Sequence, residues 1–288
     1  MAVIGTNVAS LRAANASTSA NAMLQTSMQR LSTGQRINSA KDDAAGLAIS
    51  DTMTAQIRGM NQGIRNANDG IAMAQTAEGA LGEVSNMLQR VRELTVQATS
   101  GTYSTSDKAN MQAEVSALST QITSTLANTQ FNGNTLFDAS AGTVTAATAA
   151  PAPVAPAYST FKIQAGANAA DSVNVKFNKL TDDTTITNAT SIDLTTATNT
   201  ALATVDSALK TVSTYRAGLG AAQNQLQSAV NNLTTNSTNL TAAKSQITDA
   251  DFSSETTNLA KAQILSQAST AMLAQANQSQ QGVMKLLQ

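Results

Sequence analysis

Residues 205–247 read VDSALKTVSTYRAGLGAAQNQLQSAVNNLTTNSTNLTAAKSQI and carry an apolar side chain at every seventh position. A seven-residue apolar repeat lines up side chains along one stripe of a helix, which is typical of coiled coils. Polar or charged residues occupy several companion positions of the repeat. We therefore expect one long helix with a narrow apolar face that needs partner helices. Its predicted core positions are Val205, Val212, Leu219, Leu226, Leu233, Leu240 and Ile247.

The first half of the chain carries a second helical signal. Apolar residues recur at alternating steps of three and four from Met53 to Ala98, and residues 107–128 also have one apolar face. Both patterns predict long helices. A helical glycine costs about 1 kcal/mol relative to alanine, so we expect the glycines of the first stretch to mark close contacts with other helices. These glycines are Gly59, Gly63, Gly70, Gly79 and Gly82.

The middle of the chain differs from both ends. All three prolines lie in the Ala/Thr-rich segment 139–158, which predicts a short irregular surface loop. Residues 161–163 and 173–177 alternate between apolar and polar side chains, which predicts a β-hairpin. Residues 181–200 are rich in Thr, Asn and Asp and are expected to form a loop, with Asp182 and Asp183 as solvated charges. The fold class is thus mainly α, a long antiparallel helical bundle or coiled coil with a small β-hairpin region.

The composition narrows the possible functions. The chain of 288 residues has a net charge of −1, with 12% charged residues and no Cys, His or Trp. This balance provides no basic surface for nucleic acid, and the missing residue types exclude thiolate or histidine metal sites and cysteine nucleophiles. We expect no catalytic residues, no cofactor and no metal site. No apolar run reaches the length of a membrane span, and the first residues lack a secretory signal.

Two short acidic motifs have alternative interpretations. Lys41-Asp42-Asp43 resembles a metal-binding carboxylate pair, but a helix N-terminus or an intersubunit ion pair is the favoured interpretation. Asp249-Ala-Asp251 precedes a helical stretch, and Asp is a preferred helix cap.

The two ends of the chain are weakly amphipathic and nearly uncharged. Helices of this kind are not stable alone, so bundling with other copies is expected. The predicted self-assembly residues are Leu24, Met28, Leu31, Leu265, Met272, Leu286 and Leu287.

Several long strings resemble bacterial flagellins. Residues 31–50 read LSTGQRINSAKDDAAGLAIS, residues 64–71 read IRNANDGI, and residues 75–81 read QTAEGAL. In the second half, residues 215–224 read YRAGLGAAQN and residues 274–278 read AQANQ. The resemblance covers about residues 1–138 and 200–288, in the order of the family.

The resemblance implies a filament subunit with three regions. Residues 1–44 and 251–288 would form a terminal coiled-coil domain that lines the inner tube. Residues 45–138 and 159–250 would form a helical bundle with the β-hairpin as the outer shell, and residues 139–158 a short variable surface loop. The chain would be secreted through the flagellar type III apparatus and located in the extracellular filament. Its partners would be other copies of itself, the cap, the hook-junction proteins and an export chaperone.

The resemblance also implies recognition by a host Toll-like receptor. Many flagellins carry the string found here at residues 88–97 where this receptor binds the monomer, with a glutamate on the next helix. The same surface would make axial subunit contacts in the filament. The residues implied here are Leu88, Gln89, Arg90, Leu94, Gln97 and Glu114.

Other functions remain open at this point. A hook–filament junction protein of the same family shares the terminal helices. An enzyme inserted in the middle, or a monomeric adhesin or immune ligand, is a further alternative. The short middle segment and the absence of His argue against a metallopeptidase insert.

Overall fold

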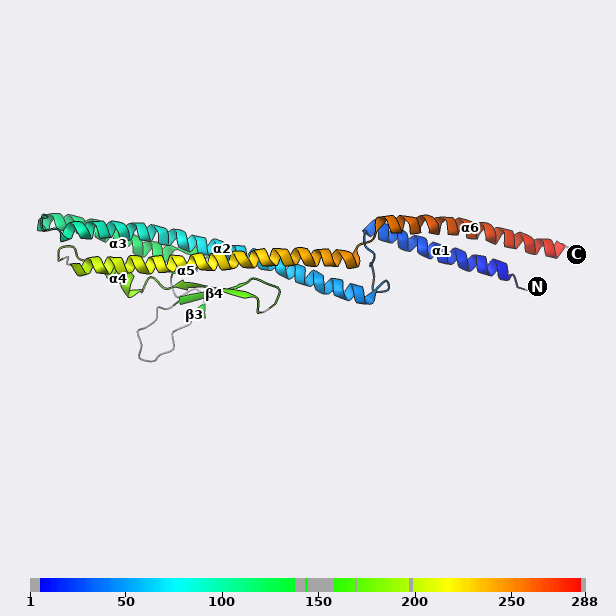
Figure 1. Ribbon diagram of the computed structural model, residues 1–288, viewed down its shortest axis with the longest axis horizontal. Coiled ribbons are helices and arrows are strands. Elements are labelled where there is room, and N and C mark those ends of the chain that lie inside the picture. Colours follow the sequence, from blue (N-terminus) through cyan, green and yellow to red (C-terminus); the bar gives the residue numbers. More distant parts are fainter. Residues whose placement is uncertain (1–5, 138–142, 145–157, 169, 197–198, 286–288) are drawn as a thin grey trace, which may run out of the picture. The chain divides into compact units, whose positions relative to one another are not determined.

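The computed structural model describes residues 6–137, 143–144, 158–168, 170–196 and 199–285 (Figure 1). Contacts within the chain divide it into two compact units. The terminal unit comprises residues 1–56 with 238–288, and the central unit comprises residues 57–237. The fold is mainly α, as the apolar periodicity predicts.

Long helices build most of the described chain, and their bounds confirm the predicted helical stretches. The helix α3 begins with a reciprocal cap, in which Ser104 and Asp107 bond to each other's backbone N–H groups. Asp43 precedes the first residue of α2, and its carboxylate accepts a hydrogen bond from the Gly46 N–H at 2.9 Å. The helices are α1 (Val8–Thr33), α2 (Ala44–Thr99), α3 (Thr105–Asn128), α4 (Thr184–Thr190), α5 (Asn199–Thr248) and α6 (Phe252–Lys285).

The heptad positions of α5 divide into two groups. The first four, Val205 to Leu226, are buried, as predicted. Leu233, Leu240 and Ile247 are only half-buried, so the prediction that they are core residues is wrong. The two groups differ because other elements cover only the first. The first four side chains belong to clusters that include residues of α2, α3, α4 and the strands, whereas the last three belong to neither cluster.

Two antiparallel sheets follow α3. Residues Asn132 and Gly133 have φ of 50° and 80° and connect the first two strands as a two-residue turn. The predicted β-hairpin is confirmed, since Phe161 pairs with Val175 and Ile163 with Val173. The strands are β1 (Gln130–Phe131), β2 (Asn134–Thr135), β3 (Thr143–Val144), β4 (Tyr158–Gln164) and β5 (Ser172–Asn178), and the larger sheet has the order β3-β4-β5.

Two segments predicted to be loops contain regular structure. Within residues 139–158, Thr143–Val144 pairs with β4, and the remainder lies outside the described residues except for Tyr158. Within residues 181–200, α4 forms because Asp183 caps its first turn, accepting a bond from the Thr185 N–H at 2.8 Å. Asp183 also accepts a hydrogen bond from the Tyr215 hydroxyl at 3.0 Å, so it is not a solvated loop charge.

The glycines of α2 have different surroundings from those we expected. A Cβ at Gly63 would lie 2.9 Å from backbone atoms of Ala165 and Gly166, and one at Gly59 would lie 2.8 Å from Ala167. The absence of a side chain at these two glycines therefore lets the β4–β5 connection, and not another helix, pack closely against α2. A Cβ at Gly70 would approach both Ile163 and Leu226 of α5, whereas Gly79 and Gly82 have nothing within 4 Å.

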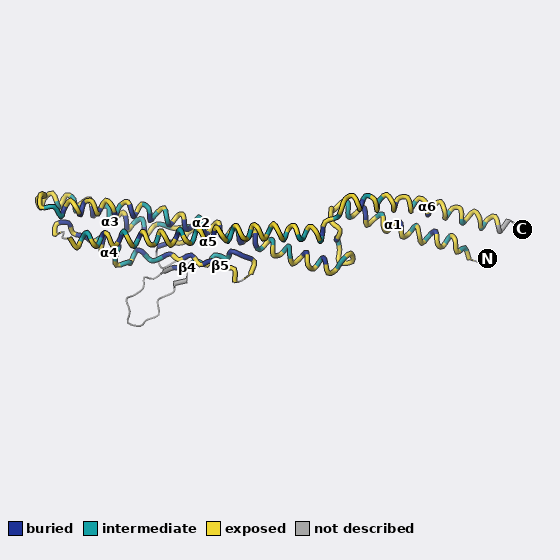
Figure 2. The backbone as a smooth tube through the Cα atoms, in the orientation of Figure 1, coloured by how far each residue is buried: buried dark blue, intermediate teal, exposed yellow. Residues whose placement is uncertain are grey.

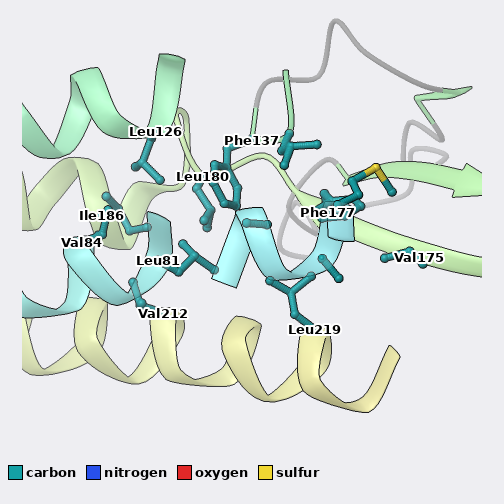
Figure 3. Close-up of a cluster of buried hydrophobic side chains, with 14 of the residues drawn as sticks. Leu81, Val84, Leu126, Phe137, Val175, Phe177, Leu180, Ile186, Val212 and Leu219 are labelled. Atoms are coloured by element: carbon teal, nitrogen blue, oxygen red, sulfur yellow. The ribbon is translucent and has the colours of Figure 1, made fainter. Parts of the chain in front are cut away.

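The core of the central unit lies between α2, α5, α3 and the β4–β5 hairpin (Figure 3). Apolar side chains from these elements converge there, and the rings of Phe161 and Phe177 meet edge to face at 5.4 Å between centroids. The residues labelled in Figure 3 are Leu81, Val84, Leu126, Phe137, Val175, Phe177, Leu180, Ile186, Val212 and Leu219.

The terminal unit contains the antiparallel pair of α1 and α6, which lie side by side (Figure 1). Asn7 caps α1 and also donates its side-chain amide to the Ala276 carbonyl at 3.1 Å. At the other end, Gly34 ends α1 with a φ of 70°, and its carbonyl accepts a bond from the Ala250 N–H. Asp251 then caps α6 through the Ser253 N–H at 2.9 Å, as predicted.

Candidate self-association surface

Small side chains form the contact between α1 and α6. The buried residues of α1 are Ala13, Ala20 and Ser27, at seven-residue spacing. The buried residues of α6 are Glu255, Ala262 and Ser269, again at seven-residue spacing. We call the five small residues of this set, Ala13, Ala20, Ser27, Ala262 and Ser269, the small-residue seam. Small residues at a coiled-coil seam let two helices approach closely, but they bury little apolar surface.

The large apolar side chains of the same two helices point to solvent. Of the eleven large hydrophobic side chains that are exposed among the described residues, eight lie on α1 and α6. Figure 2 shows exposed positions along most of both helices. A soluble protein normally covers such side chains with its own core, so this concentration indicates a surface that another chain covers. The eight are Val8, Leu11, Met23, Met28, Phe252, Ile264, Leu265 and Met272.

Polar contacts hold the register of the pair. Ser266 donates its hydroxyl to the side-chain carbonyl of Asn21 at 3.1 Å. Arg30 lies 3.7 Å from the Glu255 carboxylate, which is buried. The Nε of Arg30 is buried without a hydrogen-bond partner. Because a partly buried ion pair contributes little net stability, these contacts align the helices more than they stabilise them.

A groove of about 480 Å³ runs along one side of the α1–α6 pair. Half of its lining residues are alanines, and the exposed Met272 and the charged Arg12 also line it. Such an apolar groove can receive a side chain or a helix face from another chain. The lining residues are Ala9, Arg12, Ala13, Ala16, Ala268, Ser269, Met272, Gln275, Ala276 and Ser279.

The predicted self-assembly residues fall into three groups. Met28, Leu265 and Met272 are exposed on this surface, while Leu24 and Leu31 are half-buried beside the small-residue seam. Leu286 and Leu287 lie outside the described residues. Five further large apolar residues are exposed on the same helices and are not among the predicted self-assembly residues, namely Val8, Leu11, Met23, Phe252 and Ile264.

The predicted receptor surface is only partly exposed. Arg90 donates from Nε to Glu114 of α3 at 2.8 Å and also bonds Glu93 at 3.0 Å. The hydrogen bond from Arg90 to Glu114, followed by the one to Glu93, raises the pKa of Arg90 above its ordinary value. Leu88 and Leu94 are buried, so these two of the implied receptor residues are covered in the isolated chain.

The burial of Leu88 and Leu94 follows from the heptad spacing of α2. Both residues belong to the apolar stripe that faces the core clusters of the central unit. Gln89, Arg90, Gln97 and Glu114 remain exposed.

Ion pairs also connect α2 to α5. Arg92 donates to Asp206 at 2.6 Å, and this hydrogen bond raises the pKa of Arg92. Gln223 donates to Glu78 at 2.9 Å, and Arg216 lies 3.9 Å from the same carboxylate. Two of the polar residues at companion positions of the α5 repeat, Gln223 and Arg216, thus have a partner on α2.

The acidic motifs serve as caps and turns. Asp42 accepts bonds from the backbone of Asn38 and Ser39 and from the Ser39 hydroxyl, and the bonds from these residues lower the pKa of Asp42. Among the described residues no group of three or more metal-ligating side chains comes together. None of the helices in that part of the chain is long and apolar enough to cross a bilayer.

Comparisons with known proteins match both ends of the chain. Residues 4–142 match the bacterial flagellin N-terminal helical region, and residues 202–287 match the bacterial flagellin C-terminal helical region. The flagellin of Bacillus subtilis (strain 168) is 43% identical over 310 residues, covering 99% of each chain. The flagellin of Halalkalibacterium halodurans is 42% identical over 265 residues, covering 91% of each chain.

A solved structure gives a further comparison. The crystal structure of Bacillus cereus flagellin is 28% identical, with a TM-score of 0.47, covering 62% of this chain and 94% of that one. The family matches and the whole-length identities to curated flagellins define the relationship. The chain belongs to the bacterial flagellin family.

Proposed function

We propose that this chain is the structural subunit of a bacterial flagellar filament and that it polymerises through the outward faces of α1 and α6. The observation that carries the proposal is the arrangement of side chains on this helix pair. The buried residues of α1 are all small, whereas eight large apolar side chains of the pair face solvent. The names of the curated relatives, which are flagellins along their whole length, favour a filament subunit over a hook-junction protein.

The energetics of assembly follow from the exposed apolar surface. Covering one large aliphatic side chain contributes about 1.5–3 kcal/mol, and the helix pair presents eight large apolar side chains. A contact that joins different faces of neighbouring copies does not close and gives an open helical polymer. Polymerisation would therefore stabilise α1 and α6 beyond what their seam provides.

The proposed subunit has an inner and an outer part. In our proposal residues 1–44 and 251–288 line the inner tube, and residues 45–138 and 159–250 form the outer shell. Support comes from the ends of α1 and α6, where Gly34 and Asp251 separate the pair from the long helices. Residues 139–158 would face the outside of the filament.

The remaining parts of the proposal concern partners and location. We infer that the subunit is not an enzyme and that it is exported through the flagellar type III apparatus to the extracellular filament. An export chaperone, the filament cap and the hook-junction proteins would meet the exposed apolar side chains of α1 and α6 in turn. Each of these partners would cover apolar surface that is open in the isolated chain.

Electron microscopy of the purified full-length chain, seeded with filament fragments, tests the main proposal. The double variant Leu11→Gln/Ile264→Gln should stay monomeric, because both side chains are exposed on the helix pair and glutamine preserves helix propensity. The matched control is Thr76→Gln/Thr120→Gln, which changes two exposed residues of the central unit and should still give long polymers. Long polymers from the Leu11/Ile264 variant would contradict the proposal.

Receptor recognition of the monomer is a second proposal, supported by the exposed pair of Arg90 and Glu114. The variants Arg90→Ala and Glu114→Ala should each lower activation of a Toll-like receptor reporter cell. Gln227→Ala, at an exposed position of α5, is the control. Unchanged activation by the Arg90 and Glu114 variants would exclude this surface as the recognition site.

A further inference from the structure

The methionines of this chain are unevenly exposed. The sequence holds ten, and all exposed methionines of the described structure lie on α1 and α6. Met23 is 40% exposed, Met28 57% and Met272 63%. Met60 and Met73, in the core of α2, are only 7% and 5% exposed. The other methionines with a described burial are half-buried, namely Met53, Met87 and Met111.

We propose that Met23, Met28 and Met272 form a modification site at which oxidation to methionine sulfoxide blocks self-association of the free subunit. The inference rests on the proposed function, because it takes the outward face of α1 and α6 as the assembly surface. The inference adds that oxidation of this surface regulates assembly. The oxidants are two-electron oxygen donors such as hydrogen peroxide or hypochlorous acid.

The reaction is an oxygen transfer to a thioether. The sulfur lone pair attacks one peroxide oxygen, the O–O bond breaks, and the departing hydroxide takes the remaining proton to leave as water. Sulfur is oxidised by two electrons while the peroxide is reduced by two. Access to the sulfur controls the rate, so the three exposed methionines should react before the buried ones. The chain has no cysteine that would compete for the oxidant.

The product is incompatible with an apolar contact. A sulfoxide turns a flexible apolar side chain into a polar, chiral one. Met272 lines the groove with five alanines and with the polar side chains of Arg12, Ser269, Gln275 and Ser279, and a sulfoxide would add a polar oxygen beside the alanine methyl groups. Burying an unpaired polar oxygen at a subunit contact opposes association. The central unit should keep its fold, since the sulfurs in its core are covered.

The state of assembly should decide which methionines react. In the free subunit the three sulfurs meet solvent, whereas in the polymer neighbouring copies would cover them. Oxidation would then inactivate unassembled subunits and spare the finished polymer. The change is reversible, because two methionine sulfoxide reductases act on the two sulfoxide epimers.

The test uses the purified full-length chain and hydrogen peroxide. Mass spectrometry of its peptides, read as the mass gain of one oxygen atom, follows each methionine. We expect Met23, Met28 and Met272 to be converted before Met60 and Met73. The critical concentration for seeded polymerisation should then rise at least about tenfold, equivalent to about 1.4 kcal/mol. Treatment with both reductases should restore it.

The triple variant Met23→Leu/Met28→Leu/Met272→Leu is the matched control. Leucine keeps the size and apolar character of each side chain and has no sulfur to oxidise, so peroxide should leave the critical concentration of this variant at the value that the same variant has without peroxide. If oxidised wild type polymerises normally, or if the oxidised leucine variant loses polymerisation equally, the inference is wrong. The untreated wild type serves as reference, and its failure to polymerise would overturn the proposed function and with it this inference.

A second measurement does not depend on the variant. Peroxide is added to free subunits and to preformed polymers, and the oxidation rates of the three methionines are compared. We expect slower oxidation in the polymer at all three positions. Equal rates in both states would show that these sulfurs are not covered on assembly and would overturn the inference.

Discussion

Gly63 illustrates how a single residue sets the position of the hairpin on α2. Glycine has no Cβ atom, and a Cβ at this position would lie only 2.9 Å from backbone atoms of Ala165 and Gly166. The neighbouring Asn66 fixes the same contact, since its side-chain amide donates to the Gln164 carbonyl at 3.0 Å. The hairpin connection therefore lies directly on the helix.

Replacing Gly63 with alanine should destabilise the chain although alanine favours helices. The new methyl group would displace backbone, and overpacking of this kind costs about 1–3 kcal/mol. Gly79→Ala is the control on the same helix, where nothing lies within 4 Å. That change should stabilise the chain by about 0.5–1 kcal/mol. Urea unfolding measures both, and a stabilising Gly63→Ala would show that the hairpin does not contact α2 here.

Asp107 gives α3 a pH-dependent cap. The Ser104 hydroxyl donates to its carboxylate at 2.7 Å and the Ser104 N–H at 3.0 Å, and these bonds lower the pKa of Asp107 below its ordinary value of 3.8. A depressed folded-state pKa stabilises the fold above the unfolded pKa, and this contribution is lost as pH falls through the folded pKa.

The variant Asp107→Asn should therefore unfold with a weaker acid dependence than the parent chain. Urea unfolding between about pH 5 and pH 2 measures the difference. Ser104→Ala, which removes the hydroxyl donor, should reduce the acid dependence in the same direction. An unchanged pH dependence in both variants would show that this cap does not contribute.

At the scale of elements, the two kinds of helix contact differ in their side chains. In the central unit α2 and α5 meet through Leu and Val, and the clusters include α3 and the hairpin. In the terminal unit α1 and α6 meet through Ala and Ser at the small-residue seam. The first contact buries much apolar surface, whereas the second leaves the large side chains free for other chains.

The small-residue seam should tolerate no enlargement. Ala20 is 2% exposed against α6, so Ala20→Leu should push the helices apart and destabilise the pair by about 1–3 kcal/mol. Ala22→Leu is the control, because Ala22 faces solvent on the same helix. Limited proteolysis of the monomer should cut α1 and α6 faster in the Ala20 variant only. Equal cleavage in both variants would contradict a close seam at Ala20.

At the scale of the whole molecule, stability should be unequal between the two units. Backbone amides buried under many apolar contacts open only with large free energies, while sparsely covered helices open easily. Hydrogen exchange of the monomer should therefore be fast in α1 and α6 and slow in the part of α2 from Ala67 to Leu94.

In polymers, exchange in α1 and α6 should slow strongly while the centre of α2 changes little. Mass spectrometry of exchanged peptides from monomer and polymer measures this. If α1 and α6 of the free subunit exchange as slowly as they do in the polymer, the pair is stable without neighbouring copies. This result would contradict the proposed assembly mechanism.

Much of the fold could be predicted from local patterns. The heptads of α5, the alternation of β4 and β5 and the Asn132-Gly133 turn each depend on residues close in sequence, and all three are present in the structure. The short helix α4 was not predicted because its seven residues, about two turns, show too little apolar periodicity to stand out from a polar segment.

Other features depend on contacts between distant segments. The apolar period of α2 marks Leu94 as part of a stripe, but only the packed clusters show that the stripe faces inward, away from Arg90. Leu233 is a similar case. It occupies the same position of the heptad repeat as Leu226, but Leu226 is buried and Leu233 is only half-buried.

The sequence by itself therefore determined the family, the helical class and the hairpin, because periodicity and turn chemistry are local. The tertiary structure decided which face of each helix is buried, since burial depends on which other elements lie opposite. For α1 and α6 this distinction matters most. Both helices carry small and large apolar residues, and only the pairing of the helices shows that small residues are buried between them while eight large side chains remain exposed.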